Sequence, residues 1–516
     1  MALSFVQKPI SDSATVPVIT NYTPLVPYVV YRDASLGSVY YYHLILEVYL
    51  GASITPGAMI AKIKQKRNNY VTDVVANLAR AVFDVREIVK TRILSTVLDQ
   101  NTSAYPQSPI WRIGEADTDK IISTNLGTVQ EITVRAIEFY SGSAADEPAE
   151  ITSDAINDGK YYINASADLT FPRDTTTSGL QPDGADAVLA PYQLDGSTKR
   201  FLSDLPLDTV EADYMGYNFN LEGGLKYINY VTPYHWQSLG FMNGVDRFGS
   251  NARGFIVEYY NGVTAGTKYY FRNESANGGQ DPVTGATIDK RELILFIGCG
   301  PKNLEEQSVV TSMRPSNQFS GAWTHYRIFA VSETFYNPSG NTPVSANYWF
   351  IRGCSKYFGG ELERQAYRNK PVRLTWLNSL GCWDTYTFEG KSTESVDIDR
   401  NENEKLIGNF SDSVYSYGDY ERQKSTSTVT SKVKIKISTK YVSERLTPFI
   451  EGLIKSKEVY VHSDEDYGVT GMDWDGIRQG VVVTQSSFIR KTSVNDKIIQ
   501  YSINLEYANN FNNNSQ

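Results

Sequence analysis

The sequence predicts a mainly β protein made of several β-sandwich or β-barrel domains, with a few short amphipathic helices. Two observations support this fold class. Many short segments alternate between apolar and polar side chains, as strands do when they bury one face. The chain of 516 residues also contains 36 tyrosines and many Asn, Ser, Thr and Gly residues, a composition that favours strands joined by turns.

The length of the chain exceeds what one hydrophobic core supports, so we expect several domains. Shifts in composition predict an N-terminal β-sandwich with one helix, a loop-rich insertion or linker, a middle β-sandwich, a C-terminal β-sandwich or barrel with one helix, and a disordered tail. The corresponding ranges are 1–145, 146–214, 215–370, 371–508 and 509–516.

The first domain opens with strands over LVPYVVYRD, SVYYYHLILEVYL and AMIAKIKQ, which Pro, Gly and Asp residues separate. A helix is predicted over residues 84–98, because apolar residues recur there at helical spacing: Val85, Ile88, Val89, Ile93 and Val97. A further strand is predicted over VQEITVRAIEFY. Residues 141–160 are acidic and rich in small side chains, so we expect an exposed loop and a domain boundary near residue 145.

The middle domain contains five segments with strand character: FIVEYYN, TKYYFRN, RELILFIGCG, HYRIFAVSETFY and ANYWFIRGC. Gly298 and Gly300 follow one of these strands, as the glycines of a dinucleotide-binding loop would. Pro301 removes a backbone donor beside them, and Asn303 stands where a third glycine would be needed. We therefore predict an ordinary turn at this place, with no helix of the required pattern after it.

The C-terminal domain begins with RLTWLNSLGCWDTYTF, which reads as a β-hairpin with its turn near Asn378 and Gly381. Its large rings need cover from a second sheet or from a partner, since an isolated two-stranded ribbon is marginal in water. The candidate interaction residues are the aromatic side chains of this hairpin: Trp376, Trp383, Tyr386 and Phe388.

Residues 392–430 are polar and poor in apolar side chains. Residues 422–432 can be extended but have little to bury, and we expect a long hairpin arm there that pairs with a neighbour. Strict alternation of Val433, Ile435 and Ile437 predicts a strand. A helix is predicted after a cap at Ser443, with one apolar face formed by Leu446, Phe449, Ile450, Leu453 and Ile454. Two closing strands are predicted over 480–490 and 497–507.

The charge and the cysteines restrict the class of protein. The formal net charge is -9 and no long basic run occurs, which argues against sequence-specific nucleic-acid binding. The N-terminus lacks the pattern of a secretory signal, and no apolar run is long enough to predict a membrane span. Three widely spaced cysteines argue for synthesis in a reducing compartment and for small buried side chains in place of disulfides.

The sequence contains only weak candidates for a catalytic or metal-binding site. One candidate is a group of five acidic residues: Asp464, Glu465, Asp466, Asp473 and Asp475. These carboxylates could bind calcium or include the catalytic pair of a glycosidase, but we favour a solvated loop. A catalytic pair of Cys354 and His325 is the alternative to a buried cysteine, which we favour. We predict that the chain is not an enzyme and needs no cofactor. Of the acidic residues, Asp464, Asp466, Asp473 and Asp475 remain as weak calcium candidates.

Several segments resemble a class of virion structural proteins of tailed bacteriophages, notably phages of Bacteroidota and their marine relatives. The resemblance is carried by YYYHLILEVYLGASITPGAMIAKIKQ followed by FDVREIV, by LILFIGCGPKNL, by WLNSLGCWDTYTF and by the closing IIQYSINLEYANN. The order of elements after residue 371 is also similar to the sandwich-plus-helix unit of tail-tube and tail-adaptor proteins.

The resemblance implies a building block of the neck, tail or baseplate that is made in the host cytoplasm and ends in the virion. It implies a homo-oligomeric ring that contacts other virion proteins, with no active site to transfer. Two other functions stay open. One is a receptor-binding fibre or tip that recognises host glycans through exposed aromatic rings. The other is a glycan-degrading enzyme that uses the acids around Trp474.

Overall fold

Strands make up most of the described chain in a computed structural model of the protein, which confirms the predicted mainly β class. The structure describes residues 3–7, 18–19, 28–32, 40–66, 79–93, 122–124, 129–163, 190–205, 229–231, 235–243, 252–261, 264–273, 294–305, 323, 325–333, 340–352, 372–408, 414–439, 442, 444–462, 479–485, 487–490 and 499–508. The chain forms two units. Unit 1 comprises Met1–Thr209, His235–Ile351 and Asn378–Asp384, and unit 2 comprises Val210–Tyr234, Arg352–Leu377 and Thr385–Gln516.

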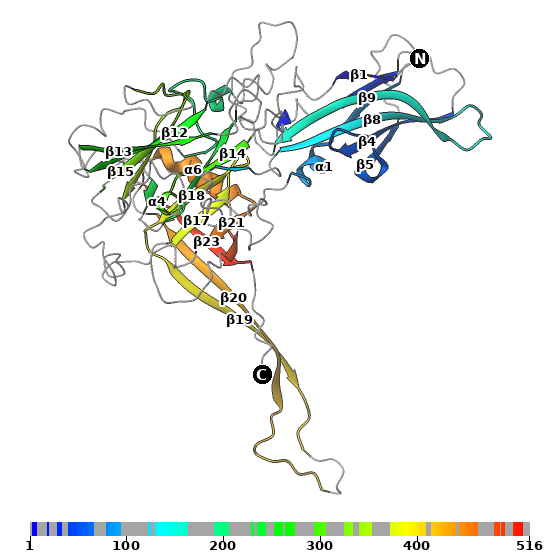
Figure 1. Ribbon diagram of the computed structural model, residues 1–516. Helices are drawn as coiled ribbons and strands as arrows, with labels where there is room; N and C mark the ends of the chain where they lie inside the picture. Colours follow the sequence, from blue (N-terminus) through cyan, green and yellow to red (C-terminus); the bar gives the residue numbers. More distant parts are fainter. Residues whose placement is uncertain are drawn as a thin grey trace. The chain divides into compact units, whose positions relative to one another are not determined.

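Unit 1 begins with two sheets (Figure 1). Three strands pair in the order β1-β3-β6, and five pair in the order β2-β9-β8-β4-β5. Their bounds are Leu3–Gln7 (β1), Val18–Ile19 (β2), Tyr28–Arg32 (β3), Tyr40–Leu50 (β4), Met59–Lys66 (β5), Ala79–Phe83 (β6), Val129–Ser141 (β8) and Ala149–Ile163 (β9). The predicted strands of this region are confirmed where they fall on described residues. A short 3-10 helix, η2 (Pro56–Ala58), lies between β4 and β5.

The acidic stretch that we predicted as an exposed loop over residues 141–160 is only partly one, because residues 142–148 form a largely exposed turn and a strand follows them. Residues 149–163 form β9, which pairs with β8 along most of its length, from Tyr140 opposite Ala149 to Val129 opposite Ile163. The expected domain boundary near residue 145 therefore falls inside a β-hairpin of one sheet. Backbone pairing with a well-formed neighbour outweighs the low strand propensity of these residues.

Two buried acids of unit 1 lie on strands that have a neighbour on each side, and basic side chains from those neighbouring strands pair with them. Glu47 accepts hydrogen bonds from Tyr49 at 2.6 Å and from Arg135 at 2.6 Å, and lies 3.0 Å from the Lys62 ammonium group. Burial acts to raise the pKa of Glu47, but these hydrogen bonds outweigh it and lower that pKa. Glu258 has the same arrangement, with Arg327 at 2.6 Å and Lys268 at 3.2 Å.

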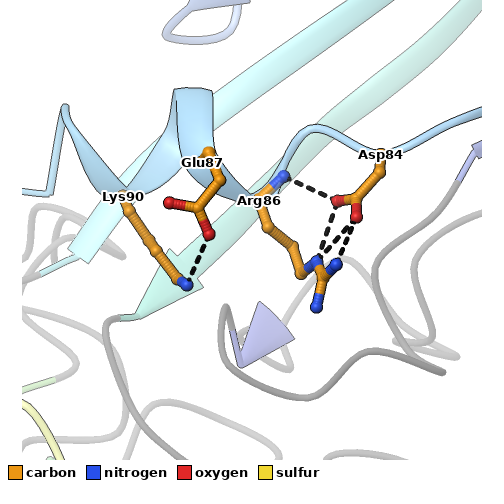
Figure 2. Close-up of polar contacts among 4 residues, drawn as sticks. All are labelled: Asp84, Arg86, Glu87 and Lys90. Atoms are coloured by element: carbon orange, nitrogen blue, oxygen red, sulfur yellow. Dashed lines mark hydrogen bonds and ion pairs between the residues drawn. The ribbon is translucent and has the colours of Figure 1, made fainter.

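A helix is present within the predicted range 84–98 but is shorter than expected: α1 covers Arg86–Lys90, residues 91–93 form a turn, and residues 94–98 lie outside the described residues. Figure 2 shows Asp84 turned toward Arg86, where its carboxylate accepts the backbone N–H at 3.0 Å and the guanidinium. These hydrogen bonds, led by the one from the Arg86 side chain, lower the pKa of Asp84. Glu87 and Lys90 form an ion pair at 2.8 Å on the exposed side, and Val89 is buried.

Two more sheets of unit 1 confirm the predicted middle strands. In one, the strands of unit 1 follow the order β16-β15-β12-β13, and in the other the order is β11-β14-β7. The bounds are Ile122–Thr124 (β7), Ser238–Met242 (β11), Gly254–Asn261 (β12), Thr264–Arg272 (β13), Ile294–Gly298 (β14), His325–Val331 (β15) and Tyr348–Arg352 (β16). Aromatic rings fill the interior, with Phe241 and Phe255 at 4.7 Å and Tyr326 and Phe350 at 4.9 Å between ring centroids. A 3-10 turn, η4 (Ala190–Tyr192), precedes the segment that contains Phe201.

The strand β14 is followed by a short helix, α4 (Pro301–Glu305), where we predicted only a turn. The glycines before it serve packing. The Asn303 side chain accepts hydrogen bonds from the N–H groups of Gln237 and Gly300, at 2.8 and 3.1 Å. A Cβ atom on Gly298 would lie 2.8 Å from the Asn303 side chain, so the space that a bound phosphate would need is occupied.

Unit 2 contains a sheet with the strand order β18-β17-β21-β22-β23-β20-β19. The bounds are Val372–Leu377 (β17), Trp383–Phe388 (β18), Thr393–Glu404 (β19), Lys424–Ser438 (β20), Val459–Val461 (β21), Gln479–Val483 (β22) and Ser502–Tyr507 (β23); β10 (Asn229–Val231) is also part of unit 2. The predicted alternating strand is the end of β20, where Ile435 and Ile437 are buried. Both predicted closing strands are shorter than expected in the described residues.

The predicted C-terminal helix is confirmed as α6 (Thr447–Lys455), which follows the 3-10 turn η8 (Glu444–Leu446). Phe449, Ile450 and Leu453 are buried on its apolar face. The residue at the N-cap of α6 is Leu446, and the proposed cap Ser443 lies outside the described residues.

The predicted hairpin is formed by β17 and β18. Asn378 organises its turn: its side-chain oxygen accepts the N–H groups of Leu380 and Cys382, at 3.0 and 2.9 Å. Gly381 has a φ angle of 77°, a left-handed conformation that glycine adopts without a Cβ penalty. The seven residues Asn378–Asp384 at the end of the hairpin belong to unit 1, and the remaining parts of β17 and β18 belong to unit 2.

Candidate interaction surface

The most exposed regular element of the described chain is the arm, which we define as β19 and β20. Their antiparallel ladder runs from Thr393 opposite Lys436 to Glu404 opposite Lys424. All 12 residues of β19 are exposed. Figure 1 shows the two strands as a long ribbon that continues beyond the other strands of its sheet. The predicted polar arm is thus an ordered hairpin whose strands pair with each other.

The arm has one apolar and one charged face, because successive side chains of a strand point to opposite sides. Val396 lies directly opposite Val433 on the apolar face, and Val396 and Ile398 are 54% and 52% exposed. On the charged face the Lys434 ammonium group lies 2.5 Å from the Asp397 carboxylate, which raises the pKa of Lys434. Water thus contacts an apolar stripe that a soluble monomer would normally cover.

The end of the arm is a loop with exposed rings. Glu421 accepts the N–H groups of Gly408 and Gly418, at 2.6 and 3.4 Å, and Tyr415 donates to the carbonyl oxygen of Ile407 at 2.7 Å. These bonds fix the loop backbone while its large side chains stay in water. The exposed side chains are Leu406, Val414, Tyr415, Tyr417 and Tyr420. Tyrosines of this kind are enriched in protein interfaces.

The four aromatic side chains that we predicted as interaction residues lie in the interior instead. Trp376, Trp383, Tyr386 and Phe388 are all buried. The ring of Phe449 on α6 lies 4.9 Å from that of Trp376 and 5.9 Å from that of Tyr386. The hairpin therefore finds its cover within the chain, and this part of the interaction hypothesis is corrected.

The other candidate residues form no reactive centre in the part of the chain that the structure describes. The acidic residues Asp464, Asp466, Asp473 and Asp475 lie outside the described residues, as do Glu465, Trp474 and Cys354. His325 is buried and stacked on Tyr260 at 4.8 Å, and burial lowers its pKa to about 4. Cys299 and Cys382 are buried thiols. No group of three or more His, Cys, Asp or Glu side chains among the described residues is arranged to hold a metal ion.

One polar cluster in unit 1 was not predicted from the sequence. The buried carboxyl group of Asp384 accepts hydrogen bonds from the Ser203 hydroxyl at 2.5 Å, the Asp204 N–H at 3.0 Å and the Asn378 amide at 3.1 Å. The Asp204 carboxylate in turn accepts the hydroxyl and the N–H of Ser379. These donors join the segment 200–205 to the end of the hairpin. We call this cluster of Ser203, Asp204, Asn378, Ser379 and Asp384 the clip, because its hydrogen bonds hold the two backbone segments together.

The fold and these surfaces define a mainly β protein with internally paired buried acids and an exposed, two-faced arm. None of its described helices is long and apolar enough to cross a membrane. In comparisons with known proteins, the sequence matched no protein-family model and no curated protein.

Proposed function

We propose that the chain is a structural protein of a tailed-bacteriophage virion, which assembles with further copies into a ring or collar of the neck, tail or baseplate. The single observation that carries the proposal is the arm, since a two-stranded ribbon is marginal in water when nothing packs on it. An exposed sheet edge also offers backbone donors and acceptors to another chain. The resemblance of several segments to phage virion proteins supports the same role.

The buried polar groups of unit 1 support a structural role over a catalytic one. Glu47 and Glu258 are each held between an arginine and a lysine, and Asp384 accepts three donors from its own chain. Carboxylates that are saturated in this way hold strands and loops in register. A catalytic acid or base must instead keep a position open toward substrate.

The test is a shortened arm. Residues 397–432 are replaced by Asn-Gly, which joins the directly opposed Val396 and Val433 through a two-residue hairpin turn. We expect the variant to unfold at the same temperature as the wild type, because the described residues that it removes are mostly exposed, but to lose its assembly in light scattering and its incorporation into particles. A wild-type chain that is strictly monomeric and absent from purified particles would contradict the proposed function.

A second candidate function is recognition of host glycans by the end of the arm. It is favoured by the exposed rings of Tyr417 and Tyr420, the latter 88% exposed, because sugars stack on aromatic faces. Tyr417→Ala and Tyr420→Ala together should then abolish saturable binding to host envelopes while leaving assembly intact. Unchanged envelope binding in this variant would remove the second candidate.

A further inference from the structure

We infer that the arm joins copies of this chain head to tail, with the outer edge of β19 in one copy beside the outer edge of β20 in the next. The inference rests on the proposed assembly function and deepens it, because it names the partner of the arm as a second copy and states which edges meet.

The charges of the two strands are complementary. β19 carries five carboxylates and one arginine, in the sequence TESVDIDRNENE. β20 carries four lysines and no acid, in the sequence KSTSTVTSKVKIKIS. Each copy therefore presents one acidic and one basic strand. Pairing unlike strands places opposite charges side by side, which favours both the rate and the orientation of association.

Both strands have an edge at which another strand can be added. β19 is the last strand in the order of its sheet. β20 pairs with β23 over Lys434–Ser438. Over Lys424–Val433, β20 pairs with β19 on one side, and no described strand pairs with its other side. An added copy would extend the antiparallel alternation of β19 and β20 without a break in direction.

The faces of the arm are compatible with this arrangement. Two neighbouring arms can be placed with their apolar faces on the same side. The charged faces then also lie on one side, and Lys432 of one copy is near acidic residues of the next copy, such as Asp397 and Asp399. On the opposite side, the exposed Val396 and Ile398 join the corresponding residues of the neighbour. The stripe of apolar surface then becomes continuous across copies and loses part of its contact with water.

Pairing of like strands is disfavoured by the same charges. Two β19 edges would bring carboxylates together, and two β20 edges would bring lysines together. A two-fold symmetric dimer through the arm is thereby discouraged. Contacts between unlike edges repeat from copy to copy and generate a closed ring or an open filament.

The first experiment reverses the charge of the β19 edge with Asp399→Lys and Glu402→Lys. Both residues face a threonine, Thr430 or Thr426, within their own hairpin, so the internal pairs of Asp397 with Lys434 and of Glu404 with Lys424 remain. Association measured by light scattering at low salt should weaken about tenfold or more. The control is Asp146→Lys with Glu147→Lys, which changes the net charge equally at another exposed turn and should leave association unchanged.

The second experiment identifies the edges that meet and does not depend on the charge variant. Asn401→Cys on β19 and Thr428→Cys on β20 are prepared in separate chains with different tags, and are treated with a short thiol cross-linker. Asn401 and Thr428 lie directly opposite each other in the β19–β20 ladder of one chain. Head-to-tail pairing predicts cross-links between the two chains in the mixture, above the background of the parent chain. Neither chain with one introduced cysteine should cross-link to itself above the background of the parent chain, which has the three natural cysteines.

The outcomes separate this inference from the proposed function. Head-to-tail pairing is overturned if assembly is unchanged in the Asp399→Lys, Glu402→Lys variant, or if the Asn401→Cys chain cross-links to itself. Either result leaves the proposed multi-copy structural protein in place. A wild-type chain that neither assembles nor enters particles overturns both. Weakened assembly of the edge variant, an unaffected control and cross-links confined to the mixture support the inference.

Discussion

The Ser203 hydroxyl donates a 2.5 Å hydrogen bond to the buried carboxyl group of Asp384, which lies 181 residues later in the chain. Burial raises the pKa of Asp384 to about 7, and the nearby Asp204 carboxylate adds to the shift because two negative charges repel. Hydrogen bonds from Ser203, Asp204 and Asn378 act in the opposite direction and are outweighed. The clip therefore holds a proton at a pH where an ordinary aspartate has none.

The contribution of Asp384 to stability should fall as the pH rises from about 4 to about 7. The folded pKa of Asp384 lies near 7 and its ordinary value is 3.8, so the folded chain keeps a proton that the unfolded chain releases between these values. The free energy of unfolding then decreases from about pH 4 to about pH 7. Thermal unfolding of Asp384→Asn across this range should show a weaker decrease than the wild type. Equal slopes for the two proteins would show that Asp384 does not hold the proton.

His325 should produce a pH dependence of the opposite sign. Burial lowers its pKa from 6.5 to about 4, so the unfolded chain binds a proton that the folded chain does not. The contribution of His325 to stability is present above pH 6.5 and is lost as the pH falls toward 4. His325→Phe keeps a ring beside Tyr260. In this variant the unfolding temperature should fall less steeply than in the wild type as the pH is lowered from 6.5 to about 4. An acid side as steep as that of the wild type would contradict this assignment.

Gly240 should not tolerate a side chain. A Cβ atom at this position would lie 2.6 Å from the Cys382 sulfur and 2.9 Å from its Cβ, both inside normal contact distance. Gly240→Ala is expected to lower the free energy of unfolding by about 1–3 kcal/mol, measured by urea denaturation. Gly57→Ala is the matched control, because nothing lies within 4 Å of its Cβ position. A Gly240→Ala protein as stable as this control would show that the site can relax without cost.

The contact between Trp376 and Phe449 should contribute to the stability of unit 2. Their rings meet edge to face at 4.9 Å, and both side chains are buried. Each alanine substitution should cost about 3–5 kcal/mol, and the double-mutant cycle should give a coupling of about 0.5–1.5 kcal/mol. Tyr420→Ala, at an exposed ring, should change stability little. Additive effects of the two core substitutions would show that the rings do not stabilise each other.

Much of the strand content could be predicted because burial on one face leaves an alternating pattern. Ile435 in β20, and Ile503 and Leu505 in β23, are buried between exposed or half-exposed neighbours. The apolar face of α6 was predicted for the same reason, because its period of 3.6 residues differs from that of a strand.

The errors arise where distant parts of the chain decide the outcome. β9 has a loop-like composition and is a strand because β8 pairs with it. Aromatic spacing predicted that the rings of the β17–β18 hairpin need cover from a second sheet or from a partner. The helix with Phe449 provides part of that cover, which the local sequence did not indicate. Ser203 and Asp384 are ordinary residues in their local context. No pattern at that separation signals that they meet.

The assignment of residues 378–384 to unit 1 has a consequence for biosynthesis. Ser203 and the Asp204 N–H emerge from the ribosome long before Asp384 is translated, so the clip closes only when most of the polypeptide has been made. Any expression fragment that stops ahead of Asp384 leaves these two donors without their acceptor. A truncated version of unit 1 therefore needs the seven residues Asn378–Asp384 to be joined to it. Cutting the sequence at a single position does not separate the two units, because their segments alternate along the chain.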